Sequence, residues 1–339
     1  MNRQTLILAA SLLFAGGVSA AQPKAILAVV SKGMPGVTLY DAATDAKICE
    51  ARMDVAPHEA AFSEDGRLLV VPVYSSANIG QPGPDGHTIN FMRTSDCHIE
   101  HALDTGEVKR PHYVERGAKS GLFYVTAEQQ QQILVVDAKK HAIVGTLPTG
   151  STKTHFFTID RDERRIYTSN VSDNTLSVID VAAKKLLMQV NVGTSNQRMT
   201  LSPDGHWFVT SLWQAGKIGV YRTRDDQPDF QIPIDGAPFV ARFSPDGRTL
   251  YNMGIPPRGA GPGAIRVWKI DVATRQVLAT SADDLGSGTG GIQVNPVNGQ
   301  LYLTAYSGKV SVLDPDSLKL LRQFGDAETP DGLFFSAVR

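Results

Sequence analysis

The sequence predicts an all-β fold, namely a seven-bladed β-propeller with four antiparallel strands in each blade. Three observations support this prediction: a four-strand unit recurs along the chain, seven equivalent positions lie 41 to 54 residues apart, and the two ends carry complementary incomplete units. A repeat of about 40 to 45 residues with four strands per unit is typical of propeller blades. Hydrophobic residues make up 42% of the chain, which contains 31 glycines and 19 prolines, so its composition favours a turn-rich globular protein over a helical bundle.

The recurring unit consists of short apolar runs that alternate at period two and are separated by turn residues. Such runs predict short antiparallel β-strands. The clearest copy places them at 165–170, 174–180, 185–190 and 197–205. A Ser-Pro-Asp-Gly turn before the second strand of a blade anchors the register, because proline suits its second position and glycine accepts a positive φ. This turn occurs at 202–205 and 244–247.

One position in each repeat, five residues before the first residue of the turn, marks the start of the inner strand of a blade. These register marks are His58, His112, His155, Gln197, Phe239, Gly290 and Asp331. Seven marks predict seven blades. The two longest intervals contain loop insertions at 78–86 and 255–264, which we expect between the second and third strands of their blades.

The two ends of the chain complete one blade between them. The N-terminal unit offers strands at 26–30, 37–41 and 47–51 but lacks an inner strand. The C-terminal segment 332–338 has the pattern of that missing strand. We therefore expect the C-terminal strand to join the N-terminal blade and close the ring, which removes two open sheet edges.

Residues 1–20 have the pattern of a secretory signal peptide: a basic start at Arg3, an apolar stretch at 6–18 and small residues before Ala21. Residues 21–339 are then one propeller domain, expected in the periplasm or outside the cell. No segment of this mature chain is apolar over the length that a membrane span needs. Its two cysteines are Cys49 and Cys97, and the sequence leaves open whether they pair.

The charge balance excludes some classes of partner. Lys plus Arg total 33 and Asp plus Glu total 34, so the net charge is −1 and no nucleic-acid partner is expected. The chain has no Cys-x-x-Cys-His motif, and its glycine-rich stretches do not open a helix after a buried parallel strand. We therefore expect neither haem nor a nucleotide.

Several repeat motifs point to a known family. They are Tyr124-Val-Thr, the run at 167–170, the run at 174–180 and the Ser-Pro-Asp-Gly turns. With these motifs the chain resembles the YVTN-type β-propeller repeat of exported bacterial and archaeal proteins over nearly all of its mature length. The related propellers include lactonase-type enzymes and the haem d1 domain of nitrite reductases. The resemblance thus implies an architecture and leaves several chemistries open.

Four register marks predict a metal site. Inner strands line the centre of a propeller, so the marks should form a ring at one mouth, where Asp331, His58, His112 and His155 occupy one contiguous arc. Imidazoles and a carboxylate that converge are suitable ligands for one transition metal ion, Zn, Cu, Fe or Ni. In the alternative interpretation, the histidines hydrogen-bond to neighbouring backbone.

Further polar residues should reach the same mouth, because the second strand of each blade ends there. The candidate ligand-binding residues are Tyr74, Asn170, Gln197 and Trp213, and the candidate catalytic residues are Glu59, Glu128 and Arg198. A carboxylate, an arginine and histidines suit acid–base work on an ester or lactone. Alternatively Glu59 and Arg198, one residue beyond their marks, point sideways between blades into salt bridges.

Three functions follow as hypotheses, and the sequence leaves open whether the protein is an enzyme. The first is an exported propeller that binds a transition metal or a small ligand through the histidine arc. The second is a lactonase-like hydrolase or isomerase that uses histidine, glutamate and arginine at the same mouth. The third is an interaction platform for another exported protein.

Overall fold

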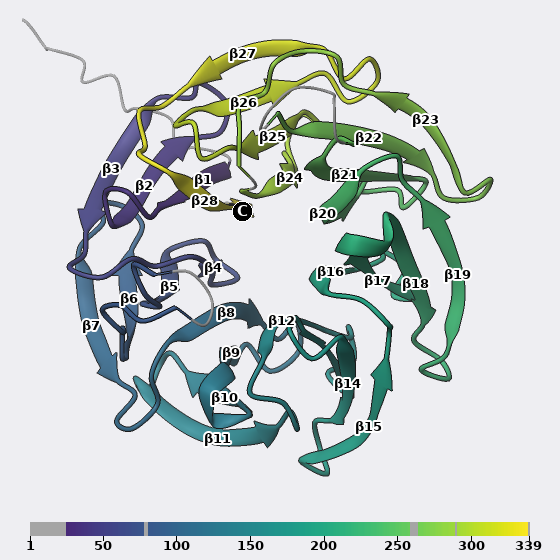
Figure 1. Ribbon diagram of the computed structural model, residues 1–339. Coiled ribbons are helices and arrows are strands. Elements are labelled where there is room, and N and C mark those ends of the chain that lie inside the picture. The colour runs from purple at the N-terminus through teal and green to yellow at the C-terminus, as the bar shows by residue number, and fades with distance from the viewer. Residues whose placement is uncertain (1–24, 78–80, 258–263, 289, 338–339) are drawn as a thin grey trace, which may run out of the picture.

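The computed structural model describes residues 25–77, 81–257, 264–288 and 290–337. Seven four-stranded antiparallel sheets stand in a ring around a central axis, which confirms the predicted seven-bladed propeller (Figure 1). The helices of the described residues are two short 3₁₀ turns, η1 (Glu128–Gln130) and η2 (Trp213–Ala215). No helix in these residues is long and apolar enough to cross a membrane. The predicted signal peptide, 1–20, lies outside the described residues.

Six blades are continuous segments of the chain, and the strands of each follow one another from the axis outward. Blade 1 contains β4 (Ala61–Phe62), β5 (Leu68–Pro72), β6 (Thr88–Arg93) and β7 (Ile99–Asp104). Blade 2 contains β8 (Pro111–Arg116), β9 (Phe123–Ala127), β10 (Gln132–Asp137) and β11 (Ala142–Pro148). Blade 3 contains β12 (Thr154–Ile159), β13 (Arg165–Asn170), β14 (Thr175–Asp180) and β15 (Lys185–Asn191).

The next three blades follow the same order. Blade 4 contains β16 (Asn196–Leu201), β17 (Trp207–Leu212), β18 (Lys217–Arg222) and β19 (Pro228–Pro233). Blade 5 contains β20 (Ala237–Phe243), β21 (Thr249–Ile255), β22 (Arg266–Asp271) and β23 (Gln276–Thr280). Blade 6 contains β24 (Ile292–Val294), β25 (Leu301–Thr304), β26 (Val310–Leu313) and β27 (Leu320–Phe324).

Blade 7 is built from both ends of the chain. It contains β28 (Pro330–Ala337), β1 (Ala25–Ser31), β2 (Gly36–Asp41) and β3 (Lys47–Arg52). The late strand β28 pairs antiparallel with β1 over partners from Ala25 with Ala337 to Val29 with Leu333, beside each other in purple and yellow in Figure 1. The predicted closure is therefore confirmed.

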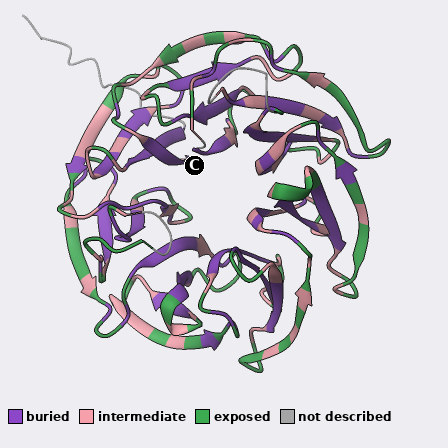
Figure 2. Ribbon diagram, viewed as in Figure 1, coloured by how far each residue is buried: buried purple, intermediate pink, exposed green. Residues whose placement is uncertain are grey.

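Packing between blades explains why β1, the second strand of blade 7, is apolar on both faces. Successive side chains of a strand point to opposite faces, so in β1 Ile26 and Ala28 pack toward blade 1 while Leu27 and Val29 pack toward blade 6. Seven apolar clusters of the described residues each fill one of the seven blade interfaces. Figure 2 shows the result, with buried strands inside and alternating exposure on the outermost strands.

The turns between first and second strands have the expected chemistry. Gly205 donates its backbone N–H to the Ser202 oxygen at 2.9 Å with φ +76°, a conformation that glycine adopts without strain. The equivalent Gly247 has φ +71° and makes the same bond to Ser244. These turns fix where each inner strand ends. They therefore also fix which residue stands at the opposite end, where the register marks lie.

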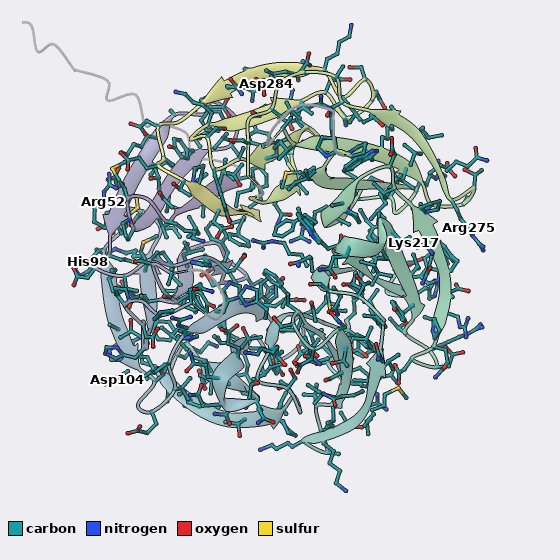
Figure 3. The ribbon with its side chains drawn as sticks, in the orientation of Figure 1. Arg52, His98, Asp104, Lys217, Arg275 and Asp284 are labelled. Carbon is teal, nitrogen blue, oxygen red and sulfur yellow. A yellow bond between two sulfur atoms is a disulfide. The ribbon has the colours of Figure 1, made fainter. Side chains whose placement is uncertain are left out.

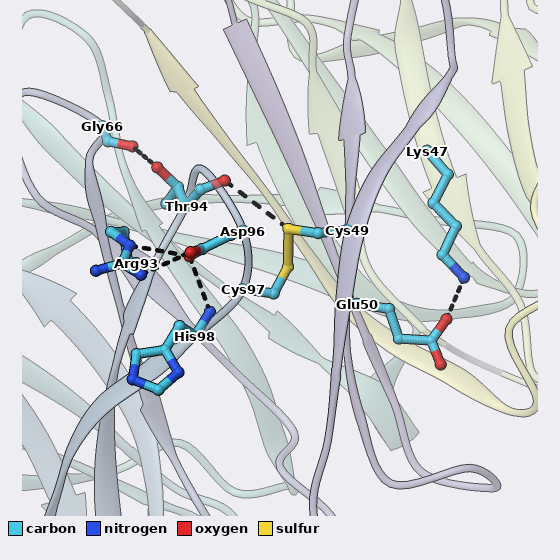
Figure 4. Close-up of a disulfide and its surroundings, with 9 residues drawn as sticks. All are labelled: Lys47, Cys49, Glu50, Gly66, Arg93, Thr94, Asp96, Cys97 and His98. Atoms are coloured by element: carbon cyan, nitrogen blue, oxygen red, sulfur yellow. Dashed lines mark hydrogen bonds and ion pairs between the residues drawn. A yellow bond between two sulfur atoms is a disulfide. The ribbon is translucent and has the colours of Figure 1, made fainter.

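A disulfide joins blade 7 to blade 1, which settles the question that the sequence left open. Cys49 on β3 and Cys97 in the turn before β7 are bonded, with 5.7 Å between their Cα atoms (Figure 4). The bond crosses the outer part of the blade interface, next to the carbonyl of Thr94. Two blades that also share an apolar cluster are thus linked covalently.

Candidate functional site

Irregular backbone at the start of the inner strands positions the site. The pairing of β8 with β9 shifts register between Pro111 and Val114, where His112 lies. Equivalent shifts surround His155 on β12, Arg198 on β16 and Phe239 on β20. A β-bulge re-aims the side chains that it contains. The bulges bring residues of neighbouring blades into the contacts described below.

Two candidates lie on the 3₁₀ turns that end second strands. Glu128 begins η1 directly after β9, and Gln131 ends that turn with a left-handed φ of 54°. Trp213 begins η2 after β17, and Gly216 ends it with φ 60°. Both turns lie at the ends of strands where the sequence predicted the mouth. Glu128 is buried, whereas Trp213 remains half-exposed.

A chain of hydrogen bonds connects three blades through a carboxylate. The Tyr74 hydroxyl donates to Glu128 Oε1 at 2.9 Å, and His155 Nδ1 lies 2.8 Å from Glu128 Oε2. All three side chains are buried. Since a carboxylate accepts, Nδ1 of His155 carries the proton, and in the neutral imidazole Nε2 keeps its lone pair for a ligand. We call Tyr74, Glu128 and His155 the relay.

The other two histidines pack against this relay. The ring of His112 stacks on that of His155 at 3.6 Å between centroids and 17° between planes. Tyr74 lies 4.5 Å from the ring of His58 and 4.6 Å from that of His112. His112 Nδ1 donates to the backbone oxygen of His155, and His58 Nε2 donates to that of Ser75, each at 3.0 Å. The interpretation in which these histidines hydrogen-bond to backbone thus describes His58 and His112.

A second group of charges adjoins the histidines. Arg198 forms an ion pair with Glu59 at 2.5 Å and lies 3.5 Å from Asp331 Oδ1. The other oxygen of Asp331 lies 3.6 Å from His58 Nδ1 and 3.8 Å from Lys32 Nζ. Glu59 on blade 1 and Arg198 on blade 4 belong to blades that are not neighbours, so this pair crosses the mouth. The salt bridge that the alternative expected is therefore present, but Glu59 and Arg198 form it with each other across the mouth rather than sideways between blades.

Burial shifts the pKa values of the carboxyl groups and histidines at the mouth. Loss of solvent raises the pKa of Glu59 and of Asp331 above their usual range, while the positive charge of Arg198 opposes that rise. The same loss of solvent lowers the pKa of His58 and of His112 well below the usual value, so both imidazoles are neutral at pH 7. Perturbed pKa values in one place are typical of functional sites.

The four residues predicted to bind a metal do not form a metal-binding group. In the described part of the chain, no three histidine, cysteine, aspartate or glutamate side chains are placed to hold one ion. The physical reason is the orientation of the rings: in-plane lone pairs of the nearly parallel His112 and His155 do not meet at one point, and His58 directs one nitrogen at a carbonyl. Arg52, labelled in Figure 3, lies at the outer edge of the ring.

The remaining ligand-binding candidates have different surroundings. Asn170 is fully buried within blade 3, where its amide bonds to Thr154, Thr175 and Ser177, so it does not join the mouth. The side-chain amide of Gln197 donates to the Ser195 hydroxyl at 3.2 Å. Trp213 meets Phe239 edge-on, with 5.4 Å between ring centroids.

Two residues of the site, Lys32 and Phe156, were not predicted from the sequence. Lys32 follows the end of β1, as Glu128 follows β9 and Trp213 follows β17, so the strand-end rule would have found it. Phe156 had no such signal. Its ring lies 4.6 Å from the Arg198 guanidinium and 4.6 Å from the ring of His155, and so it separates the two groups.

A further pair of ionisable groups lies on inner strands, nearer their other ends. Arg242 on β20 donates to Gln293 at 3.3 Å, and the backbone of Ile159 contacts Glu115 on β8 at 3.4 Å. Burial raises the pKa of Glu115 to about 7. The same burial lowers the pKa of Arg242. No sequence pattern separates these two residues from ordinary strand positions.

The fold and the buried polar mouth define a β-propeller with a candidate small-molecule or acid–base site. The chain matches the family model of the cytochrome D1 heme domain over residues 118–233, which includes Glu128, His155 and Arg198 but neither His58 nor Asp331. No curated protein matches the chain. Membership of the YVTN-type family stays a prediction.

Solved structures share the fold. A functionally unknown protein from Desulfotomaculum acetoxidans DSM 771 is similar with a TM-score of 0.75 and 14% identity, over 92% of this chain and 98% of that one. A candidate 6-phosphogluconolactonase from Bacteroides uniformis ATCC 8492 is similar with a TM-score of 0.72 and 13% identity, over 93% of this chain and 100% of that one. Hydrazine synthase from Kuenenia stuttgartiensis is similar with a TM-score of 0.53 and 18% identity, over 66% of this chain and 71% of that one. At these identities the likeness concerns the fold alone.

Proposed function

We propose that the mouth of this propeller binds a small organic ligand through the relay. The observation that carries the proposal is the buried chain from Tyr74 through Glu128 to His155, with bonds of 2.9 and 2.8 Å. Burying three polar side chains is unfavourable unless they are paired, and this pairing still leaves Nε2 of His155 without a hydrogen bond to any of the described residues. Of the two predicted occupants, a metal ion and a small ligand, this arrangement favours the small ligand.

The test is to identify what accompanies the protein. We would purify it from its own host without tag or chelator, denature it, and analyse the released compounds by mass spectrometry and the protein by elemental analysis. We expect one organic compound with the wild type, lost from His155→Ala and Glu128→Gln. His206→Ala is the matched control, because His206 is exposed on a turn. Stoichiometric Zn, Cu, Fe or Ni, or equal retention by all variants, contradicts the proposal.

A second candidate function is hydrolysis of a lactone or ester, as the likeness to the candidate 6-phosphogluconolactonase suggests. The favouring observation is that His155 and Arg198 contact the same ring, that of Phe156. In this scheme His155 Nε2 takes a proton from water, and the resulting hydroxide attacks the lactone carbonyl. Arg198 stabilises the developing oxyanion, the ring C–O bond breaks, and the imidazolium returns its proton to the leaving oxygen.

Hydrolysis is tested by turnover of dihydrocoumarin, glucono-δ-lactone and γ-butyrolactone. Because Glu128 orients His155 rather than touching substrate, Glu128→Gln should lower kcat by about 100-fold or more, the range for loss of general acid–base catalysis, with the fold retained. Circular dichroism and urea unfolding would check the fold. Unchanged turnover in Glu128→Gln and His155→Ala would falsify this candidate.

We also propose that the protein is exported. The pattern of residues 1–20 and the disulfide between Cys49 and Cys97 support an oxidising compartment, where disulfides persist. Cell fractionation and N-terminal sequencing test this: we expect a periplasmic or secreted protein that begins at Ala21. A cytoplasmic protein with an intact N-terminus contradicts it.

A further inference from the structure

The mouth is aromatic on the side away from the histidines. Trp213 of blade 4 and Phe239 of blade 5 meet edge-on and are both half-exposed. Tyr306, which follows β25 in blade 6, is 38% exposed and has the Lys32 ammonium 5.5 Å from its ring centroid. The histidines belong to blades 1 to 3. A ligand at this mouth therefore meets hydrogen-bonding groups on one side and aromatic faces on the other.

Arg198 connects the two sides. Its guanidinium carbon lies 4.6 Å from the ring of Phe156 and 5.9 Å from that of Phe239. The side chain is only 4% exposed, yet its Nε has no hydrogen-bond partner in the described residues, and neither has Oε2 of Glu59. Buried polar atoms without partners are costly, so these two atoms provide a donor and an acceptor for a bound molecule.

The charges of the mouth decide which molecules fit. The cations near the site already face carboxyl groups: Arg198 meets Glu59 and Asp331, and Lys32 meets Asp331. Arg110, whose guanidinium lies 5.6 Å from the Tyr74 ring, pairs with Asp85. Glu128 adds a further carboxyl group. The neutral His58 and His112 supply no positive charge. The site therefore lacks the surplus of positive charge that a phosphorylated ligand requires, and its carboxyl groups would repel one.

We propose that the ligand is an uncharged, planar aromatic molecule that carries a hydrogen-bonding oxygen. This inference deepens the small-ligand function proposed above and rests on it. The ring packs against Phe239 and Trp213, and the oxygen faces Arg198 and the relay. The proposal separates this site from one for a phosphorylated sugar lactone, which presents a dianion and no aromatic face.

Three probes test it by isothermal titration calorimetry: 4-hydroxyacetophenone (aromatic and uncharged), myo-inositol (uncharged without an aromatic ring) and 6-phosphogluconate (multiply anionic). We expect 4-hydroxyacetophenone to bind tightest and to quench tryptophan fluorescence. Trp213 should report the quenching, because Trp268 is buried between blades and Trp207 begins β17 at the opposite end of that strand. The signal should therefore disappear in Trp213→Phe.

Variants separate the contribution of the aromatic contact to binding affinity from the contribution of charge. Phe239→Leu keeps an apolar side chain but removes the ring, so we expect affinity for 4-hydroxyacetophenone to fall about tenfold. Phe230→Leu, on the outer strand β19, is the matched control and should bind like the wild type. Asp331→Asn removes one negative charge and should raise the affinity for 6-phosphogluconate.

The outcomes distinguish this inference from the function on which it rests. If myo-inositol or 6-phosphogluconate binds more tightly than the aromatic probe, and His155→Ala abolishes that binding, the aromatic ligand class is wrong while the small-ligand site stands. If 4-hydroxyacetophenone binds equally to Phe239→Leu and the wild type, the aromatic contact is overturned. If none of the three probes binds and no organic compound accompanies the purified protein, both proposals fail.

Discussion

Single ionisable residues of the propeller differ in charge because their burial differs. Glu115 on the inner strand β8 loses most of its contact with water, and this raises its pKa from 4.5 to about 7. The folded state therefore holds a proton on Glu115 at pH values where the unfolded chain has released it. Stability from this group is present below about pH 4.5 and is lost as the pH rises through about 7.

Glu115→Gln should remove this pH dependence. Between about pH 5 and about pH 7.5 we expect the free energy of unfolding of the wild type to fall by about 1 to 2 kcal/mol relative to that of the variant. Urea unfolding at the two pH values measures the difference. Glu107→Gln, an exposed carboxylate, is the control and should follow the wild type. Parallel pH profiles for all three proteins would show that Glu115 ionises normally in the folded state.

At the scale of single residues, the sequence predicted positions that depend only on the register of the repeats. It placed His58, His112 and His155 together because the turns fix the length of every inner strand. It could not orient the rings, since β-bulges around His112 and His155 depend on how strands pair in three dimensions. The metal-site prediction depended on that orientation.

At the scale of elements, the disulfide between β3 and the turn before β7 fixes two outer strands of neighbouring blades. The outermost strands otherwise depend on hydrogen bonds to one neighbour and on half-buried side chains. A cross-link of this kind restricts the unfolded chain, in this protein over a sequence separation of 48 residues.

Cys49→Ala combined with Cys97→Ala should lower the free energy of unfolding by about 2 to 4 kcal/mol. The same loss should follow when dithiothreitol reduces the wild type. Guanidinium unfolding with and without reductant checks both, and the double variant serves as the control that reductant leaves unchanged. A wild type whose unfolding midpoint ignores complete reduction contradicts this expectation.

The elements themselves were largely predictable, and their irregular parts were not. The alternation of residues 165–180 predicted β13 and β14 because strand period and turn residues are local properties. The pair formed by Glu59 and Arg198 joins blades far apart in sequence, and no local pattern encodes it. The pairing of Cys49 and Cys97 is non-local in the same way.

At the scale of the whole molecule, the ring is closed by β28. Leu333 on this strand is 1% exposed and packs with Leu27, Val29 and Tyr302, so it joins blade 7 to blade 6. This contact is the counterpart of the apolar clusters that fill the other six interfaces. The incomplete N-terminal unit revealed the closure in the sequence, because an inner strand was missing there and present at the other end.

Leu333→Ala should therefore lower the free energy of unfolding of the whole domain, by about 2 to 5 kcal/mol, since it leaves a cavity at the closure. Leu321→Ala is the matched control: Leu321 lies on β27 and is 47% exposed, so its removal should change stability by less than about 0.5 kcal/mol. Thermal and urea unfolding compare the two. Equal effects would mean that the closure contributes no more than an outer strand does.

The closure also dictates an order of events during folding. The edge of β1 finds its partner only when β28 arrives, about three hundred residues later in the chain. Until then an apolar edge, with Leu27 and Val29 on it, is open to any other extended chain. Nascent copies crowded together are thus prone to exchange their last strands, so the yield of correctly folded monomer should decline as the rate of synthesis increases.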